Sequence, residues 1–257
     1  MAITVNTNIF SLAAQRNISR SQLNLQTAVQ RLSSGLRINM AKDDAAGLAV
    51  ASYAEMHGRG AEVAQRTIGD GISYLGVADN ALRTVNELLQ RMRELAVQYA
   101  NGTYNTTQKG YMSIEFSQLE TEAGSILGRA KFNGATIFGA GAKTIVAGPD
   151  GSTISITVAS PTVSGASIGT LSTVETAIDN VNTELADIGA FQSRLEKALT
   201  TAMAVEEAQW SAYGRIMDAD MARETARLTS AQVVQQAGVA ALAQANTLPQ
   251  LALGLLG

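Results

Sequence analysis

The sequence has no cysteine and few prolines, histidines or aromatic residues. Without cysteine in 257 residues, disulfides, thiol nucleophiles and cysteine-ligated metals are excluded. His57 is the single histidine, so the paired histidines of an HExxH metal site cannot form. Aromatic residues make up 5% of the chain and prolines number 3, while 46% of residues are apolar. Leucine, isoleucine, valine and alanine must therefore supply the core, which favours helices packed on helices over an aromatic-rich β-sandwich.

Charge is missing from both ends of the chain. Nothing before Arg16 is charged, and residues 228–257 carry no charge after Arg227. A net charge of −3 without a basic block argues against binding to phosphate backbones or acidic membranes. The tail is long enough to span a bilayer, but glutamine and asparagine side chains interrupt it at a cost that lipid would not offset. We therefore predict no nucleic-acid binding and no membrane insertion, and expect both ends to be buried against protein.

Candidate catalytic groups are few. No G-x-S-x-G elbow accompanies His57, which we interpret as a solvated residue. The segment 139–144 resembles a phosphate-binding loop only superficially, because Ala142 stands where a glycine must precede the lysine. Nearby carboxylates on a helix point in different directions, so three acidic pairs are expected to be caps or solvated faces: Asp43/Asp44, Glu206/Glu207 and Asp218/Asp220. We predict no enzymatic activity, no cofactor and no metal.

Apolar residues recur at helical spacing along most of the chain. Stripes over 68–99, 112–126 and 174–202 predict three helices, and Asn101-Gly102 is expected to end the first of them. A narrow stripe from Ile18 to Leu36 looks like one helix of a coiled coil whose partner is missing locally. The tail predicts the partner, with an alanine-rich stripe of Leu228, Ala231, Val234, Ala237, Ala241, Ala245 and Leu248.

The segment 132–169 differs in character, because it is rich in glycine, serine and threonine and nearly free of charge. Apolar residues alternate at Ile154, Ile156 and Val158 after a Gly-Pro-Asp-Gly turn at 148–151, which predicts a β-hairpin. The patterns together predict a mainly α protein. We expect a long antiparallel coiled-coil-like helical rod with a small β-hairpin region near 132–169 and paired N- and C-termini.

Several blocks of this sequence resemble those of bacterial flagellins. LSSGLRIN at 32–39, followed by AKDDAAG at 41–47, resembles the N-terminal signature of that family. RIMDAD at 215–220, QQAG at 235–238 and LAQAN at 242–246 resemble its C-terminal pattern. The similarity covers roughly 1–138 and 171–257, and the short middle indicates a minimal flagellin. Met40, where serine or threonine is common, and the final Gly257 depart from the pattern.

The resemblance implies a structural subunit that is exported unfolded through the flagellar type III apparatus and self-assembles into the extracellular filament for motility. It implies an inner terminal coiled-coil domain, 1–40 plus 214–257, and a helical rod domain, 41–213. Implied partners are other copies of the chain, the export machinery, an export chaperone, and cap and junction proteins. The uncharged ends would be buried between copies, with a polymerisation core of Leu25, Val29, Leu32, Leu228, Val234, Ala241 and Leu248.

Two further contacts follow from the resemblance. Ser33-Ser34-Gly35 is either a simple helix break or a hinge, with Lys42, Asp43 and Asp44 in subunit contacts. The vertebrate Toll-like receptor that senses flagellin reads a set of positions that otherwise pack between protofilaments. In this sequence they are Leu89, Gln90, Arg91, Leu95, Gln98 and Glu115, with Arg91 as the central charge. The alternative function is that of a hook–filament junction protein, which would form a limited ring.

Overall fold

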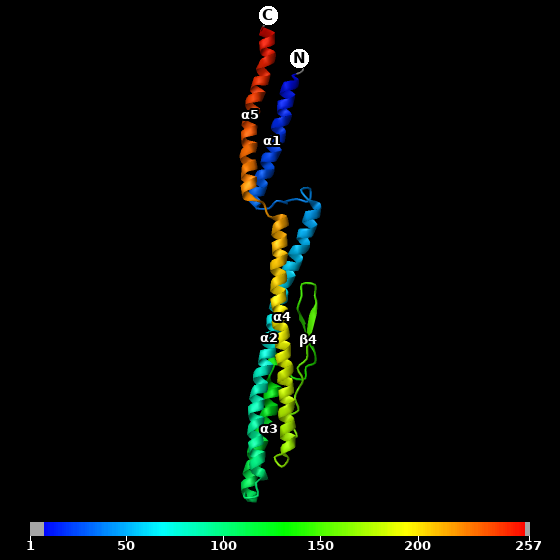
Figure 1. Cartoon of the computed structure of the whole chain (residues 1–257), viewed down its shortest axis with the longest axis vertical. Coiled ribbons are helices and arrows are strands. Elements are labelled where there is room, and N and C mark those ends of the chain that lie inside the picture. Colours follow the sequence, from blue (N-terminus) through cyan, green and yellow to red (C-terminus); the bar gives the residue numbers. More distant parts are fainter. Residues whose placement is uncertain (1–7, 255–257) are drawn as a thin grey trace. The chain divides into compact units, whose positions relative to one another are not determined.

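The computed structural model describes residues 8–254, and side chains over 8–247. Most of these residues lie in the helices α1 (Ile9–Ser34), α2 (Ala45–Ala100), α3 (Thr106–Arg129), α4 (Leu171–Met217) and α5 (Met221–Gly254) (Figure 1). The named strands form two antiparallel pairs, β1 (Lys131–Phe132) with β2 (Ala135–Thr136) and β3 (Lys143–Val146) with β4 (Thr153–Ile156). The predicted mainly α class is confirmed.

The chain forms two compact units. The terminal unit comprises Met1–Glu55 and Gln209–Gly257, and the central unit comprises Met56–Ala208. Each unit therefore contains residues from both halves of the sequence. The domain boundaries that we expect from the resemblance, at 40/41 and 213/214, stay a prediction.

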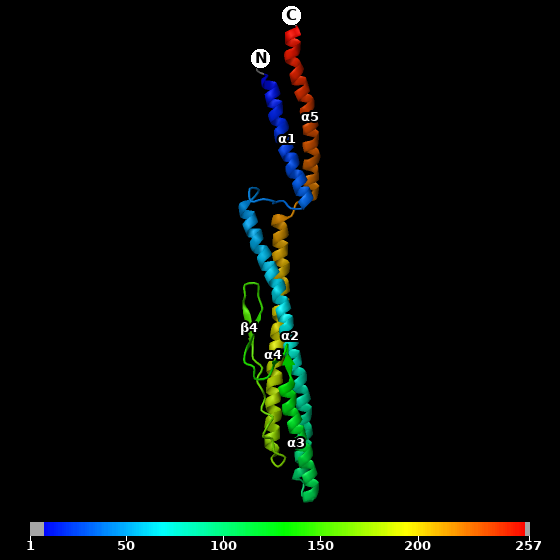
Figure 2. The same ribbon diagram turned by 180° about the vertical axis from the view of Figure 1, so that it is seen from behind.

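The central unit packs α2, α3 and α4 side by side (Figure 2). Its core contains large aliphatic side chains that are fully buried, each stabilising the fold by roughly 1.5–3 kcal/mol relative to exposure. On α2 these recur at a heptad spacing, as at Ile68, Leu75, Leu82 and Leu89. Leu195 of α4 reaches the same core. This unit buries its apolar face within one chain.

The helix α2 begins much earlier than the apolar stripe predicts. It starts at Ala45 and not near Ile68, and its first turns bury Ala51, Ala54, Ala61 and Ala64. Alanine gives a weak apolar signal but is the strongest helix former and allows close packing. The end of the helix at Ala100, directly before Asn101-Gly102, is as predicted.

The predicted β-hairpin is confirmed as β3 and β4, with Lys143 opposite Ile156 and Val146 opposite Thr153. It lies against α2, where the Thr67 hydroxyl donates to the Val146 carbonyl at 2.6 Å. The shorter pair β1–β2 was not predicted. Its turn is Asn133-Gly134, and both residues have positive φ, at 49° and 80°. Asn-Gly between two short strands is a strong hairpin signal that would have located this turn.

Candidate functional site

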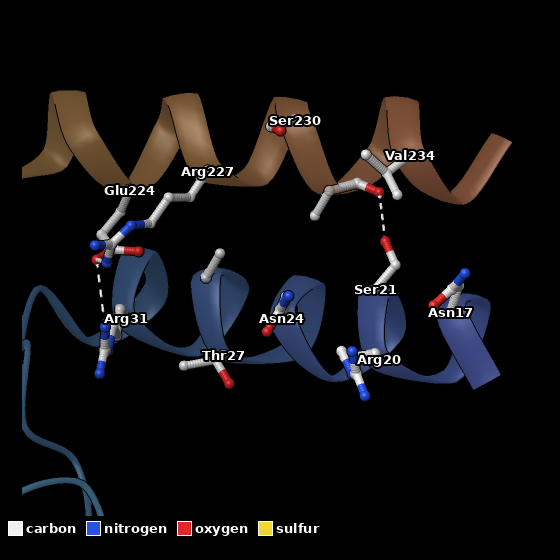
Figure 3. Close-up of a pocket in the computed structure, with 12 residues that line it drawn as sticks. Asn17, Arg20, Ser21, Asn24, Thr27, Arg31, Glu224, Arg227, Ser230 and Val234 are labelled. Carbon is white, nitrogen blue, oxygen red and sulfur yellow. Dashed lines mark hydrogen bonds and ion pairs between the residues drawn. The ribbon is translucent and has the colours of Figure 1, made fainter. Parts of the chain in front are cut away.

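The candidate site is the surface of the helix pair α1–α5 in the terminal unit. The two helices lie side by side and run antiparallel (Figure 1). The amide of Asn8 donates to the Ala245 carbonyl at 2.8 Å, and the Ser21 hydroxyl donates to the Ala231 carbonyl at 3.0 Å (Figure 3). The predicted pairing of the two terminal segments is thereby confirmed.

The contact between the helices, which we call the seam, is narrow and follows a heptad on both sides. Alanine, serine and glycine fill half of its positions, and the helices approach closely. A β-carbon added at Gly238 would lie 2.8 Å from Cγ1 of Ile18. Spacings of three and four residues connect all the seam positions. They are Ser11, Ala14, Ile18, Ser21, Leu25, Ala28 and Leu32 on α1, and Glu224, Leu228, Ala231, Gln235, Gly238, Leu242 and Ala245 on α5.

The stripe of tail residues that the sequence predicts to contact the N-terminal helix is wrong at its centre. Leu228, Ala231 and Ala245 do lie in the seam, but Val234, Ala237 and Ala241 are exposed. The seam takes an amide and a glycine at 235 and 238 because the backbones come close, so the apolar residues at 234, 237 and 241 face outward. The side chain of Leu248 lies outside the described residues.

Both helices consequently carry large apolar side chains on surfaces that face away from the seam, which we call the outer face. Phe10 is 60% exposed, Leu23 is 64% exposed and Val239 is 57% exposed. Apolar surface of this kind on a soluble protein usually marks an interaction site. The outer face comprises Ile9, Phe10, Leu12, Leu23 and Val29 of α1, with Val233, Val234 and Val239 of α5.

The predicted polymerisation core is divided between the two surfaces. Leu25, Leu32 and Leu228 lie in the seam and are half-buried. Val29, Val234 and Ala241 are exposed and so can meet another molecule directly.

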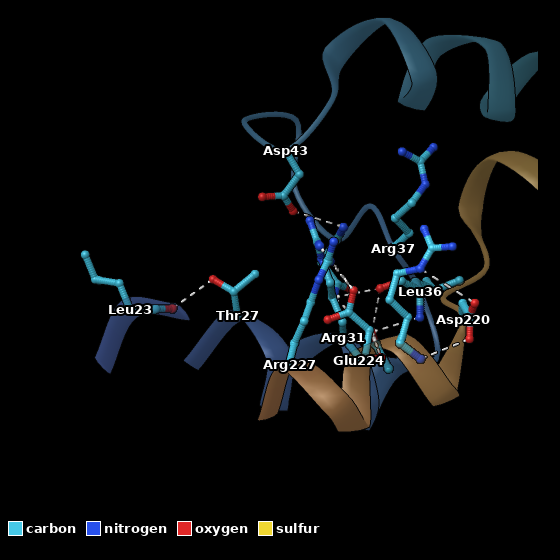
Figure 4. Close-up of polar contacts among 12 residues, drawn as sticks. Leu23, Thr27, Arg31, Leu36, Arg37, Asp43, Asp220, Glu224 and Arg227 are labelled. Carbon is cyan, nitrogen blue, oxygen red and sulfur yellow. Dashed lines mark hydrogen bonds and ion pairs between the residues drawn. The ribbon is translucent and has the colours of Figure 1, made fainter. Parts of the chain in front are cut away.

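A polar cluster closes the seam at its charged end. Glu224 of α5 is buried, and its Oε1 accepts from Arg31 of α1 at 3.4 Å and from Arg227 of α5 at 2.7 Å (Figure 4). The cluster lines a groove of about 650 Å³ between the helices, together with Arg20 and several serine, threonine and asparagine side chains.

The segments that follow α1 and precede α5 are tied together by backbone hydrogen bonds. Arg37 N–H donates to the Met217 carbonyl at 2.6 Å, and Ala219 N–H donates to the Gly35 carbonyl at 2.8 Å. Gly35 has a φ of 72° and ends α1, so the helix break predicted at Ser33-Ser34-Gly35 is confirmed. A hinge function at this break stays a proposal.

The acidic pair after this break caps the local backbone. Asp43 accepts from the N–H groups of Asn39 at 3.2 Å and Met40 at 3.1 Å, and these bonds hold the pKa of its carboxyl below the ordinary value. Asp44 accepts from Gly47 N–H at 2.8 Å. Both carboxylates therefore have local roles as caps.

The second predicted surface lies on α2 and α3 of the central unit. The guanidinium of Arg91 donates to Glu115 of α3 at 2.8 Å and to Glu94 of α2 at 2.9 Å. Gln90 and Gln98 are exposed beside it. Leu89 and Leu95, in contrast, are buried in the core of this unit, so they support the surface from beneath. Exposed apolar residues on the same two helices were not predicted as part of this surface: Val97, Tyr111 and Ile114.

The described residues contain no group of three or more His, Asp or Glu side chains that could hold a metal ion. His57 is half-buried on α2. Within the part of the chain that the structure describes, no helix combines the length and the hydropathy needed to cross a membrane.

Comparisons with known proteins give consistent results. The family model described as the bacterial flagellin N-terminal helical region matches residues 5–144, and that of the C-terminal helical region matches residues 171–256. The flagellar filament 33 kDa core protein of Treponema phagedenis is 34% identical over 98% of this chain and 99% of its own length. A flagellin of Halalkalibacterium halodurans is 35% identical with the same coverage. The crystal structure of a Bacillus cereus flagellin is 28% identical, with a TM-score of 0.49 over 53% of this chain and 88% of that one.

Proposed function

This chain belongs to the bacterial flagellin family and is a structural, non-enzymatic subunit of the flagellar filament, and from that premise we propose how its terminal helices build the polymer. The outer face of the α1–α5 pair is the surface that neighbouring copies cover. We infer that the terminal segments 1–40 and 214–257 form the inner layer of the filament and that 41–213 forms the layer around it.

The exposure of the outer face carries this proposal. Two helices in contact along a narrow seam can bury only one stripe each, so the remaining apolar residues need another molecule. Val29 and Val234 are on opposite helices, and each is about half exposed. Because these side chains are already about half buried, complete burial by a neighbour would add roughly 0.8–1.5 kcal/mol for each of them, summed over many subunits.

The lack of charge near both ends of the chain, before Arg16 and after Arg227, fits the same role. All charged residues of α1 and α5 lie between Arg16 and Arg31 and between Arg223 and Arg227. An unpaired ion buried between subunits would cost several kcal/mol. Amide side chains, which are frequent there, can bond sideways between copies or to water. We infer that the contact between copies is heterologous, or head-to-tail, because a contact of that type generates a filament when it does not close into a ring.

Assembly also requires delivery of the chain to the growing end. We propose export of the unfolded chain through the flagellar type III apparatus, with an export chaperone before export and with cap and junction proteins at the ends of the polymer. The long uncharged segments would stay unassembled during transit because their outer face is buried only when several copies meet.

Substitution of Val234 tests the proposal. Val234→Asp places a charge on the outer face and should abolish filament formation from sheared seeds, as seen by negative-stain microscopy. Val234→Ala removes apolar area without adding charge and should still assemble. Deletion of 228–257 should leave soluble subunits. Long filaments from Val234→Asp or from the truncated chain, or only short rings from the wild-type chain, would contradict the proposal.

We propose a second role for the exposed polar surface around Arg91. Gln90, Gln98 and Glu115 present side chains that a neighbouring protofilament or the flagellin-sensing Toll-like receptor can contact. Arg91→Ala should lower receptor signalling in a reporter assay. Arg83→Ala is the matched control, because Arg83 is also exposed on α2 in an ion pair, with Asp79 at 2.7 Å. Equal signalling by the two variants would remove the receptor role and leave the filament role intact.

A further inference from the structure

The seam between α1 and α5 offers little to fix how the two helices align lengthwise. Its positions are mostly alanine, serine, glycine and leucine, and the heptad repeats along both helices. A slide of one helix by seven residues, about 10 Å, would again place small residues against small residues. Packing opposes the slide at one contact, because Ala245 would replace Gly238 opposite Ile18, but elsewhere along the seam packing distinguishes poorly between the native alignment and a slipped one.

Three polar contacts cross the seam among the described residues, and they differ in what they recognise. Asn8 and Ser21 both donate to backbone carbonyls of α5, at Ala245 and Ala231. Every residue offers a carbonyl, so these two bonds can re-form after a slide. The contact of Arg31 with Glu224 joins two side chains and so depends on the sequence at both positions (Figures 3 and 4).

Burial makes the contact between Arg31 and Glu224 selective for one alignment of the helices. The side chain of Glu224 is 6% exposed and that of Arg31 is 21% exposed. Nε of Arg31 is buried without a hydrogen-bond partner, so its guanidinium depends on Glu224 for compensation. Glu224 is also the only acidic residue within α1 or α5 as the structure describes them. After a slide of seven residues Ala231 would take its place, and Arg31 would be partly buried without a carboxylate.

We propose that the Arg31–Glu224 pair sets the register of the α1–α5 coiled coil. A single buried polar pair is a known way for a coiled coil to specify alignment, even where it adds little net stability. Arg227 does not share this role, because it lies on the same helix as Glu224 and moves with it. The inference rests on the proposed function for its consequence, since a slipped pair offsets the apolar residues of α1 and α5 on the outer face and would not match the next subunit.

Disulfide crosslinking can read the register, because the chain contains no cysteine of its own. Ser21→Cys with Ala231→Cys reports the native register. Ala28→Cys with Ala231→Cys reports a slide of seven residues, because 28 lies about 10 Å along α1 from 21 and a disulfide requires α-carbons within about 7 Å. Both pairs are measured in the free chain and in seeded filaments, as the fraction of chains crosslinked.

In the wild-type background we expect the native pair to crosslink and the slipped pair to remain largely reduced. Glu224→Gln should raise crosslinking of the slipped pair at least fivefold and lower that of the native pair. Arg227→Gln, the matched control, should leave both unchanged although it removes the shorter of the two ion pairs. The reversed triple variant Arg31→Glu, Glu224→Arg, Arg227→Glu should restore the native pattern.

The other possible outcomes either contradict the register inference or contradict only the filament proposal. A wild-type pattern in Glu224→Gln, an equal shift in Arg227→Gln, or a native pair that fails to crosslink in the wild type would overturn it. If Glu224→Gln forms no filaments, its free chain and the reversed triple variant are compared, and failure of the triple variant to restore assembly also counts against it. Native crosslinking in a wild-type chain that never polymerises would refute the filament proposal and leave the register inference standing.

Discussion

The two units of this protein handle their apolar residues in opposite ways. The central unit encloses most of its large apolar side chains, so that Leu82, Leu89 and Leu195 have no exposed surface, and leaves only a few exposed on its helices, such as Tyr111 and Ile114. The terminal unit leaves Phe10 and Leu23 more than half exposed and places alanine and serine in its seam. The central unit therefore has the core of an independent domain, whereas the terminal unit has a surface that needs neighbours.

The difference follows from the number of helices that meet. Three helices around a common axis, with a hairpin laid against them, surround a large side chain on all sides. Two helices cover only a narrow stripe, whatever residues they carry. A subunit that polymerises gains from this division, because its closed core is in one unit and its exposed apolar surface is in the other.

The largest expected effect comes from a matched pair of leucine-to-alanine substitutions, one in each unit. Leu195→Ala should lower the free energy of unfolding of the central unit by about 2–5 kcal/mol, since it leaves a cavity in a closed core. Leu25→Ala, in the half-buried seam, should cost less than about 1 kcal/mol in the free chain. Denaturant unfolding followed by circular dichroism measures both. Equal losses would show that the seam is as well packed as the core.

Much of this division was predictable from the sequence, because large apolar residues at heptad spacing identify the helices of the central unit. The early start of α2 and the true seam of α5 were not. Both depend on alanine, glycine and glutamine, as at Ala61 and Gln235, which carry no distinctive apolar signal. Their burial results from close approach of two backbones, and that depends on residues far away in the chain, such as Ile18 opposite Gly238.

The sequence predicted which segments form the candidate site, but not which of their residues face the seam and which face outward. The uncharged ends indicated burial against protein, and the outer face is apolar as expected. The assignment of Val234 to a helix–helix stripe was wrong because an average spacing of valine and alanine drifted off the heptad. The role of Glu224 was not foreseen, although a lone acidic residue near the start of an otherwise uncharged stripe is a visible signal.

Two glycine-to-alanine substitutions test how closely α1 and α5 approach each other, because one should lower stability and the other should raise it. Gly238→Ala should destabilise the helix pair, because the new methyl group overpacks against Ile18 at a cost of about 1–3 kcal/mol, which exceeds a gain in helix propensity of about 1 kcal/mol. Gly124→Ala in α3 meets no atom within 4 Å and should stabilise by about 0.5–1 kcal/mol. Thermal melting of the free chain and dissociation temperatures of filaments measure these effects. A stabilising Gly238→Ala would indicate a looser seam.

An exposed ion pair tests whether surface charge contributes to the stability of the central unit. Arg91→Ala removes the contacts with Glu94 and Glu115 and should lower stability by less than about 1 kcal/mol, because both carboxylates are half exposed to solvent. The difference from the wild type should shrink near 1 M salt, because a screening length of about 3 Å weakens exposed ion pairs. Melting curves at low and high salt provide the measurement. A loss that persists at high salt would mean that the arginine packs as well as pairs.

The smallest effects concern two carboxyls whose pKa values move in opposite directions. Asp43 in the terminal unit has a lowered pKa because backbone N–H groups stabilise its charge, so its contribution to stability is present above its ordinary pKa of 3.8 and is lost as the pH falls. Burial raises the pKa of Glu184 in the central unit above 4.5, against the bond from Ala159 N–H at 2.7 Å. Its contribution is therefore full below pH 4.5 and is lost as the pH rises through the folded-state pKa.

Two amide variants separate these carboxyls. Asp43→Asn should be less stable than the wild type near neutral pH, with a difference that disappears on acidification, because only the charged form is held by the backbone. Glu184→Gln keeps an oxygen acceptor for Ala159 and cannot ionise, so it should gain stability relative to the wild type as the pH rises above 4.5. Melting temperatures between about pH 3 and pH 8 are compared for the three chains. Parallel curves for Glu184→Gln and the wild type would show that the carboxyl of Glu184 is solvated, and that the central unit is less closed around it than its neighbours indicate.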